Sequence, residues 1–228
     1  MESKMTVTSK LALTSLLHQL GAVKPKPLPL AHASTPDTHV STLANLDTES
    51  ASQARSTLMT LHFLFPHELL PALDLLDRKL VTGLRYRQAE SLAAEVFYIQ
   101  SASAVTESHG RRPANSRFKN AGSAARVYYE VRLDSWNCSC AAFAQSHMKL
   151  LLAHAPGNQK NDATGEADFG QSLFGGVATK ADALIPTCKH ILAAAIGSAA
   201  PCLFANGIQY EDVTLEALAA WAAGFGEA

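Results

Sequence analysis

The sequence predicts an α+β fold, in which a helical N-terminal region packs on a small β-β-α module and a strand and a helix follow at the C-terminal end. Three observations support it. Leucines recur at helical spacing in residues 58–80, apolar and polar side chains alternate in residues 126–134, and the alanine-rich segment 191–199 has the composition of a helix. Apolar residues make up 47% of the 228 residues, which is usual for globular proteins.

The bulk properties exclude some classes of protein. The net charge of −1 creates no overall field that would draw the chain to nucleic acid or to an anionic membrane, so any such contact must come from a local patch. The longest apolar run, residues 191–205, is too short to span a bilayer and contains Pro201. The chain has four cysteines, and its first twenty residues lack the apolar core of a secretion signal. We expect a soluble protein of a reducing compartment.

Residues 1–49 are expected to form an N-terminal helix and a mobile linker. Leucines at helical spacing predict a short amphipathic helix over residues 8–20, and the prolines of residues 24–29 then interrupt regular structure. Residues 50–93 are expected to be a helical region. Pro66 fits the first turn of a new helix there, and Pro71 is tolerable because it lies close to the start of that helix.

The β-β-α module is expected to span residues 94–200. Residues 95–101 predict one strand, and the alternation of residues 126–134, with Tyr129 and Val131 on one face and Tyr128 and Glu130 on the other, predicts a second that pairs with it as a hairpin. Residues 106–122 are polar and basic and are expected to form a loop between them. Residues 141–154 and 191–199 are expected to be helices, separated by a Gly-, Asn- and Asp-rich insertion at residues 156–187.

Residues 201–228 are expected to form a C-terminal tail with structure of its own. Residues 207–213 predict a strand. Thr214 can cap a last helix that runs through Trp221 and carries Glu216 in its first turn, where a carboxylate is favoured by the helix dipole.

Three cysteines and a histidine have the spacing of metal ligands: Cys138, Cys140, Cys188 and His190. Residues two apart on an extended chain point to the same side, so each pair can direct two ligand atoms at one point. Three thiolates and one imidazole complete a tetrahedral zinc shell with no open position, which is typical of one structural zinc ion. The alternative is that these cysteines are small buried hydrophobic residues. Cys202 has no partner at ligand spacing, and we expect it to be a core thiol.

The same residues resemble a SWIM-type zinc finger, whose pattern is Cys-x-Cys, a variable gap and Cys-x-His on a β-β-α frame. Phe143, behind the first pair, also matches that pattern. A closer resemblance is to the SWIM-domain subunit of the Shu complex. It is carried by the Phe-Pro-x-Glu-Leu element at residues 65–69, by the Trp-x-Cys-Ser-Cys run that starts at Trp136, and by Ala193 three residues after His190.

That resemblance implies a non-catalytic adaptor in the nucleus. Such subunits bind RecA-like recombinase paralogues and promote recombinase assembly during homologous recombination, a pathway of DNA repair. Trp136, Phe143 and Ala193 are then expected to support the zinc finger structurally. A small residue at Ala193 lets its helix lie close to the metal-bearing strand, so we expect Ala193→Thr to be more disruptive than Ala194→Thr. The leucine face of residues 50–80 is wider than a small finger needs to cover, and we expect part of it to meet the partner.

Two other functions fit parts of the sequence. Nine histidines are compatible with an enzyme, but no nucleophile motif accompanies them, and zinc with four protein ligands has no site for water. We therefore predict no catalysis and no small-molecule substrate. The basic loop offers Arg111, Arg112, Arg117 and Lys119 to the phosphates of single-stranded DNA, as in a SWIM-type nucleic-acid-binding protein. The alternative for these charges is a solvated loop.

Overall fold

The computed structural model describes residues 9–24, 46–88, 91–102, 127–153, 173–174, 177–178, 185–204 and 207–224. Among these residues the chain forms six helices and a five-stranded mixed sheet, which confirms the α+β fold. The expected linker after residue 24, the basic loop with its three arginines and Lys119, and most of the insertion lie outside the described residues. None of the described helices is both long and apolar enough to cross a membrane.

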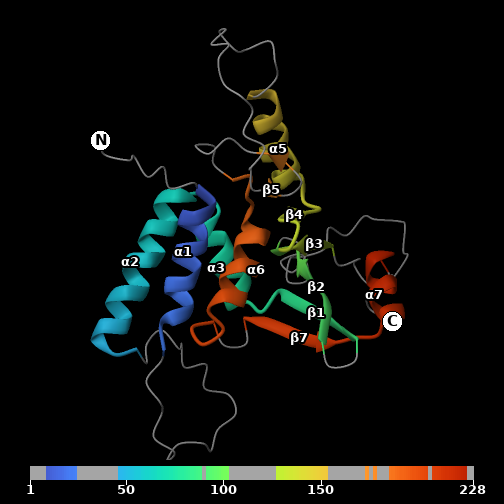
Figure 1. Ribbon diagram of the computed structural model, residues 1–228, viewed down its shortest axis with the longest axis horizontal. Coiled ribbons are helices and arrows are strands. Elements are labelled where there is room, and N and C mark those ends of the chain that lie inside the picture. The colour runs from blue at the N-terminus through green and yellow to red at the C-terminus, as the bar shows by residue number, and fades with distance from the viewer. Residues whose placement is uncertain are drawn as a thin grey trace, which may run out of the picture.

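Four helices form a layer beside the sheet. They are α1 (Ser9–Ala22), α2 (Thr48–Leu64), α3 (Leu69–Asp77) and α6 (Lys189–Ala199). Helix α6 lies between the other helices and the sheet, and both α1 and α3 pack on it (Figure 1). Gly197 permits one close approach, because a Cβ atom at that position would lie 2.6 Å from the Ile208 Cδ1 atom. The central position of α6 explains why its residues from His190 to Gly197 are all buried.

The turn between α2 and α3 explains the two prolines. The Asp47 side chain caps α2 by accepting a hydrogen bond from the backbone N–H of Ser50. Pro66 lies in the turn that follows α2, three residues before α3 begins, so the prediction that it occupies the first turn of that helix is wrong. Pro71 is in the first turn of α3, where a missing N–H breaks no helical hydrogen bond, as the sequence predicts.

The helical region does not extend to residue 93. Helix α3 ends at Asp77, and strand β1 (Val81–Gln88) follows, so the prediction of helix over residues 81–88 is wrong. This strand lies inside the sheet, between β2 and the edge strand β7, and is covered on both faces at its start. Its residues therefore do not alternate between buried and exposed positions as they do in a half-exposed strand. Without that alternation the sequence gives no period-two pattern from which the strand could be predicted.

The five-stranded sheet has the order β4-β3-β2-β1-β7. Its remaining strands are β2 (Ser91–Gln100), β3 (Tyr128–Arg132), β4 (Asn137–Cys138) and β7 (Ile208–Asp212). Strand β2 pairs antiparallel with both β1 and β3, which confirms the expected pairing of the two strands of the module. Strand β7 pairs parallel to β1. Within the expected insertion, Leu173–Phe174 (β5) and Val177–Ala178 (β6) form a separate antiparallel pair.

The two faces of the sheet are covered by different helices. One face contributes Val81, Phe97, Ile99 and Val131 to the main core, which also contains α6. The other face carries a smaller cluster of Leu84, Val96 and Tyr98, against which Leu218 and Trp221 of α7 (Leu215–Ala222) pack. Thr214 caps α7 as predicted, by accepting a hydrogen bond from the backbone N–H of Ala217. Figure 1 shows α7 on the side of the sheet away from α1 and α2.

Candidate metal centre

The first ligand pair lies at the edge of the sheet. A turn after β3 leads into β4, where Cys138 pairs with Val131. The backbone of Trp136 in that turn has φ 47°, a left-handed conformation that is uncommon outside glycine. Cys140 follows at the start of α5 (Ala141–Ala153), and its Sγ atom accepts a hydrogen bond of 3.4 Å from the backbone N–H of Phe143. The end of a strand and the start of a helix thus fix the two sulfur atoms.

The second ligand pair lies at the start of α6. Cys188 is the N-cap residue, with an extended backbone at φ −140° and ψ 167°. His190 lies in the first turn of the helix, so the prediction of an extended chain through both ligands is wrong. The helical turn still places the His190 ring and the Cys188 sulfur on the same side, and Tyr129 of β3 stacks on that ring at a centroid distance of 4.5 Å.

The structure brings all four predicted ligands together. One ligand atom from each of Cys138, Cys140, Cys188 and His190 lies within 4.8 Å of the others, and all four residues are buried. The Cys138 Sγ atom is 3.9 Å from the His190 Nδ1 atom. These four residues can bind one metal ion, because their ligand atoms converge on one point. The two chain segments that carry them are 48 residues apart in the sequence, counted from Cys140 to Cys188.

The thiols interact strongly with one another. Hydrogen bonding with Cys138 holds the pKa of Cys140 well below its usual range. Hydrogen bonding with Cys140, and then with Cys188, raises the pKa of Cys138. Because the three sulfur atoms are buried and close together, negative charge on all of them is unfavourable without a counter-charge. A divalent cation bound among them supplies that charge and stabilises the thiolates. Metal binding here releases thiol protons, so metal affinity falls as the solution becomes more acidic.

The expected supporting residues are all buried close to the ligand segments. The Trp136 indole Nε1–H donates a hydrogen bond of 2.9 Å to the carbonyl oxygen of Pro186, which ties the turn before the first pair to the segment before the second. Phe143 is buried at the start of α5, and Ala193 is fully buried one turn after His190. Ala194 is fully buried as well, so the expected contrast between Ala193 and Ala194 has no basis in exposure.

Other sequence expectations need correction. Cys202 is exposed, so the prediction of a core thiol is wrong. It lies in the turn that follows α6, and its neighbour Leu203 fills the core instead. Ile185 and Thr187, at the C-terminal end of the expected insertion, are buried. Tyr129 is a further site residue, and its place on the same strand face as Val131 is the sequence signal for it.

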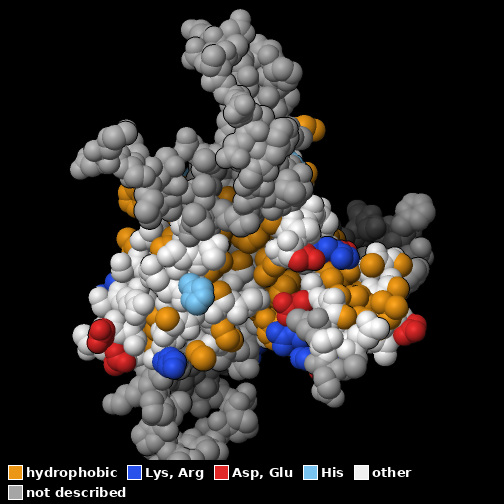
Figure 2. Space-filling view, in the orientation of Figure 1, with side chains coloured by type: hydrophobic (Ala, Val, Ile, Leu, Met, Phe, Trp, Pro, Cys, Tyr) orange, Lys and Arg blue, Asp and Glu red, His pale blue; other side chains and the backbone are white. Residues whose placement is uncertain are grey.

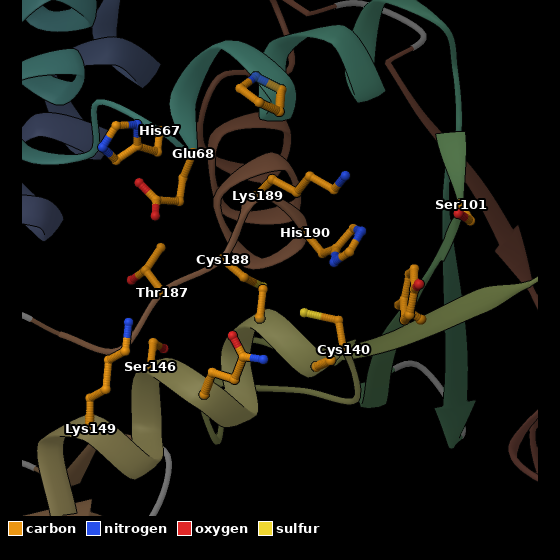
Figure 3. Close-up of a pocket in the computed structure, with 15 residues that line it drawn as sticks. His67, Glu68, Ser101, Cys140, Ser146, Lys149, Thr187, Cys188, Lys189 and His190 are labelled. Carbon is orange, nitrogen blue, oxygen red and sulfur yellow. The ribbon is translucent and has the colours of Figure 1, made fainter. Parts of the chain in front are cut away.

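A cavity of about 530 Å³ lies beside the metal ligands (Figure 3). The N-terminal turns of three helices line it: Glu68 at the start of α3, Ala141 at the start of α5, and Lys189 at the start of α6. Helix N-termini carry partial positive charge, and they therefore favour the negative charge of the nearby thiolates.

A scan against models of known protein families finds no match to this chain, and a search of the curated proteins finds none either.

Proposed function

We propose that this protein is a non-catalytic adaptor built around one structural zinc ion. The observation that carries the proposal is the buried convergence of Cys138, Cys140, Cys188 and His190. Thiolate and imidazole are the ligands that zinc prefers, and four protein ligands fill its tetrahedral shell. A shell filled in this way leaves no position for a water nucleophile, which supports a structural role over a catalytic one.

The proposed partner is a RecA-like recombinase paralogue, in a Shu-type complex that promotes recombinase assembly during homologous recombination in the nucleus. The support for this partner is the resemblance of the ligand pattern to SWIM-type zinc fingers, together with exposed apolar side chains on the helical layer. Phe63 is 88% exposed, Leu70 is 62% exposed and Met59 is 59% exposed. Met59 and Phe63 stand one turn apart on the outer face of α2, and exposed apolar residues grouped in this way are typical of protein interfaces.

Affinity purification from the native cell tests this proposal. We expect a RecA-like paralogue to be recovered with the wild-type chain and to be lost when Phe63→Glu places a charge on the exposed face of α2. Gln53→Glu is the matched control, because Gln53 is also exposed on α2 but lies away from Met59 and Phe63 on the helix surface. Recovery of the same paralogue with both variants would place the interface elsewhere, and recovery of no such protein with the wild type would contradict the proposed complex.

The second candidate is direct binding of nucleic acid by the basic loop. Four positive charges within residues 111–119 favour it, since lysine and arginine contacts to phosphates supply most non-specific affinity for nucleic acid. Binding of the purified protein to single-stranded DNA at increasing salt concentration separates the two functions. Tight binding that weakens steeply with salt and is lost on Arg111→Ala with Arg112→Ala favours this second candidate.

A further inference from the structure

The cavity beside the metal ligands has features that the structural role of the metal does not use. Its wall includes His67 and Lys149 in addition to the three helix N-termini, and Figure 3 shows Lys189 and His190 both coming from the start of α6, with Lys149 on α5 across the space. At about 530 Å³ it falls in the size range of ligand sites and is far larger than a single water molecule needs. The cavity can therefore accept a side chain from another molecule.

One polar atom in this wall lacks a hydrogen bond. The Nε2 atom of His190 is buried and has no hydrogen-bond partner among the residues that the structure describes. The residue as a whole is only 3% exposed, and it lines the cavity. The other ring nitrogen, Nδ1, faces the cysteine sulfurs, so metal bound to Nδ1 leaves the proton on Nε2. A metal-bound histidine normally donates this second N–H to a carboxylate, a carbonyl or water.

The charges around the cavity favour an anion that carries a single charge. Lys149 and Lys189 contribute two positive charges and Glu68 one negative charge, which leaves one positive charge with histidines counted as neutral. The three thiolates with a divalent metal carry a net charge of about −1 next to it. One carboxylate together with Glu68 balances the two lysines and accepts the His190 N–H, whereas a phosphate dianion would leave excess negative charge beside the thiolates.

We propose that the cavity binds the carboxylate of an aspartate or glutamate side chain from a protein partner, with His190 Nε2 and Lys189 as its donors. This inference rests on the proposed adaptor function and adds to it the chemistry of the partner residue and the place where it docks. The carboxylate completes a carboxylate–histidine–metal arrangement across the interface. Lys149, farther from the ring, attracts the acidic residue without contacting the same oxygen atoms.

Nuclear magnetic resonance of the metal-loaded full-length chain, labelled with ¹⁵N in histidine, tests the proposal. The probe is the α-amide of N-acetylglutamic acid, whose only charge is the side-chain carboxylate, and the uncharged control is the corresponding glutamine compound. We expect the acidic probe to move the His190 Nε2–H resonance downfield with saturation and the glutamine compound to leave it unchanged. Inorganic phosphate is titrated in parallel.

Matched lysine variants locate the binding site. We expect Lys189→Gln to weaken the probe about tenfold, because a hydrogen bond to a charged group is lost, and Lys149→Gln to weaken it about two- to threefold through long-range attraction alone. Lys24→Gln, at an exposed lysine outside the cavity wall, is the control and should change nothing. No resonance shift with the acidic probe, equal weakening in all three variants, or saturation by phosphate but not by the carboxylate would each overturn the proposal.

Partner recovery separates this inference from the adaptor function. If the RecA-like paralogue binds the wild type and the Lys189→Gln variant equally well, the proposal that a partner carboxylate docks in the cavity is wrong, and the proposed adaptor function stands. If the acidic probe binds in the cavity but no paralogue is recovered with the wild type, the site stands and the proposed complex is wrong.

Discussion

The two helices that cover the sheet differ in how they are held. Helix α6 lies in the main core with eight consecutive buried residues, and its first turn contains His190 of the candidate metal site. Helix α7 covers the opposite face and has no buried residue, and it is held mainly by Trp221 against Tyr98 and Tyr128, at ring-centroid distances of 4.8 and 5.5 Å. Figure 2 shows apolar side chains still exposed in this part of the molecule. One side of the sheet thus carries a helix buried in the main core, whereas the other carries a helix without buried residues that is held by aromatic contacts.

The largest expected loss of stability comes from removing a ligand of the candidate metal site. Cys138→Ser or His190→Ala should abolish metal binding and the cooperative unfolding of the main core, because the binding free energy of a structural zinc, about 10–16 kcal/mol in small zinc domains, is also folding free energy. Cys202→Ser is the control, since Cys202 is exposed and is not a ligand. Metal content and thermal unfolding measure both effects. A Cys138→Ser variant with the same melting temperature as the wild type would contradict the proposed difference between the two sides of the sheet.

A smaller effect is expected from overfilling α6. Ala193→Thr and Ala194→Thr should each destabilise the fold by about 1–3 kcal/mol, because both residues are fully buried and a larger side chain must displace the helix. Ala219→Thr on the exposed face of α7 changes helix propensity equally without adding volume to the core and should cost at most about 0.7 kcal/mol. Urea unfolding measures all three. Equal midpoints for Ala193→Thr and Ala219→Thr would show that α6 is not tightly packed.

Removing the main contact of α7 should act locally. Trp221→Ala should expose the amides of α7 to hydrogen exchange and cost about 1–2 kcal/mol, less than a fully buried tryptophan, because Trp221 is only partly buried. The metal content and the protection of α6 amides should not change. Loss of metal from this variant would mean that the two sides of the sheet are coupled.

The last prediction concerns alkaline pH on the α7 side. Burial, with the nearby Glu130 carboxylate, raises the pKa of Tyr98 to about 12. The unfolded chain releases this proton near pH 10 and the folded chain only near pH 12, so stability from Tyr98 is complete below pH 10 and declines between these values. The wild type should therefore lose stability faster than Tyr98→Phe over this window. Parallel stability profiles for the two proteins would show that Tyr98 titrates normally.

Several features of the site were predictable because they depend on local spacing. The Cys-x-Cys and Cys-x-His pairs, the strand faces of Tyr129 and Val131, and the cap at Thr214 all follow from neighbouring residues. The rest depends on tertiary contacts that sequence spacing does not reveal. Strand β1 was missed because burial on both faces hides its period, and the exposure of Cys202 follows from the end of α6 at Ala199. The Trp136 hydrogen bond to Pro186 crosses 50 residues and required the folded structure.

We expect one zinc ion, held by Cys138, Cys140, Cys188 and His190, to organise the main core. X-ray absorption at the zinc edge of the protein purified under reducing conditions tests it most directly. We predict one zinc per chain, with three sulfur neighbours at about 2.3 Å and one nitrogen at about 2.0 Å. A fully folded protein that contains no metal, and whose unfolding midpoint does not change when zinc or a chelator is added, would contradict the claim.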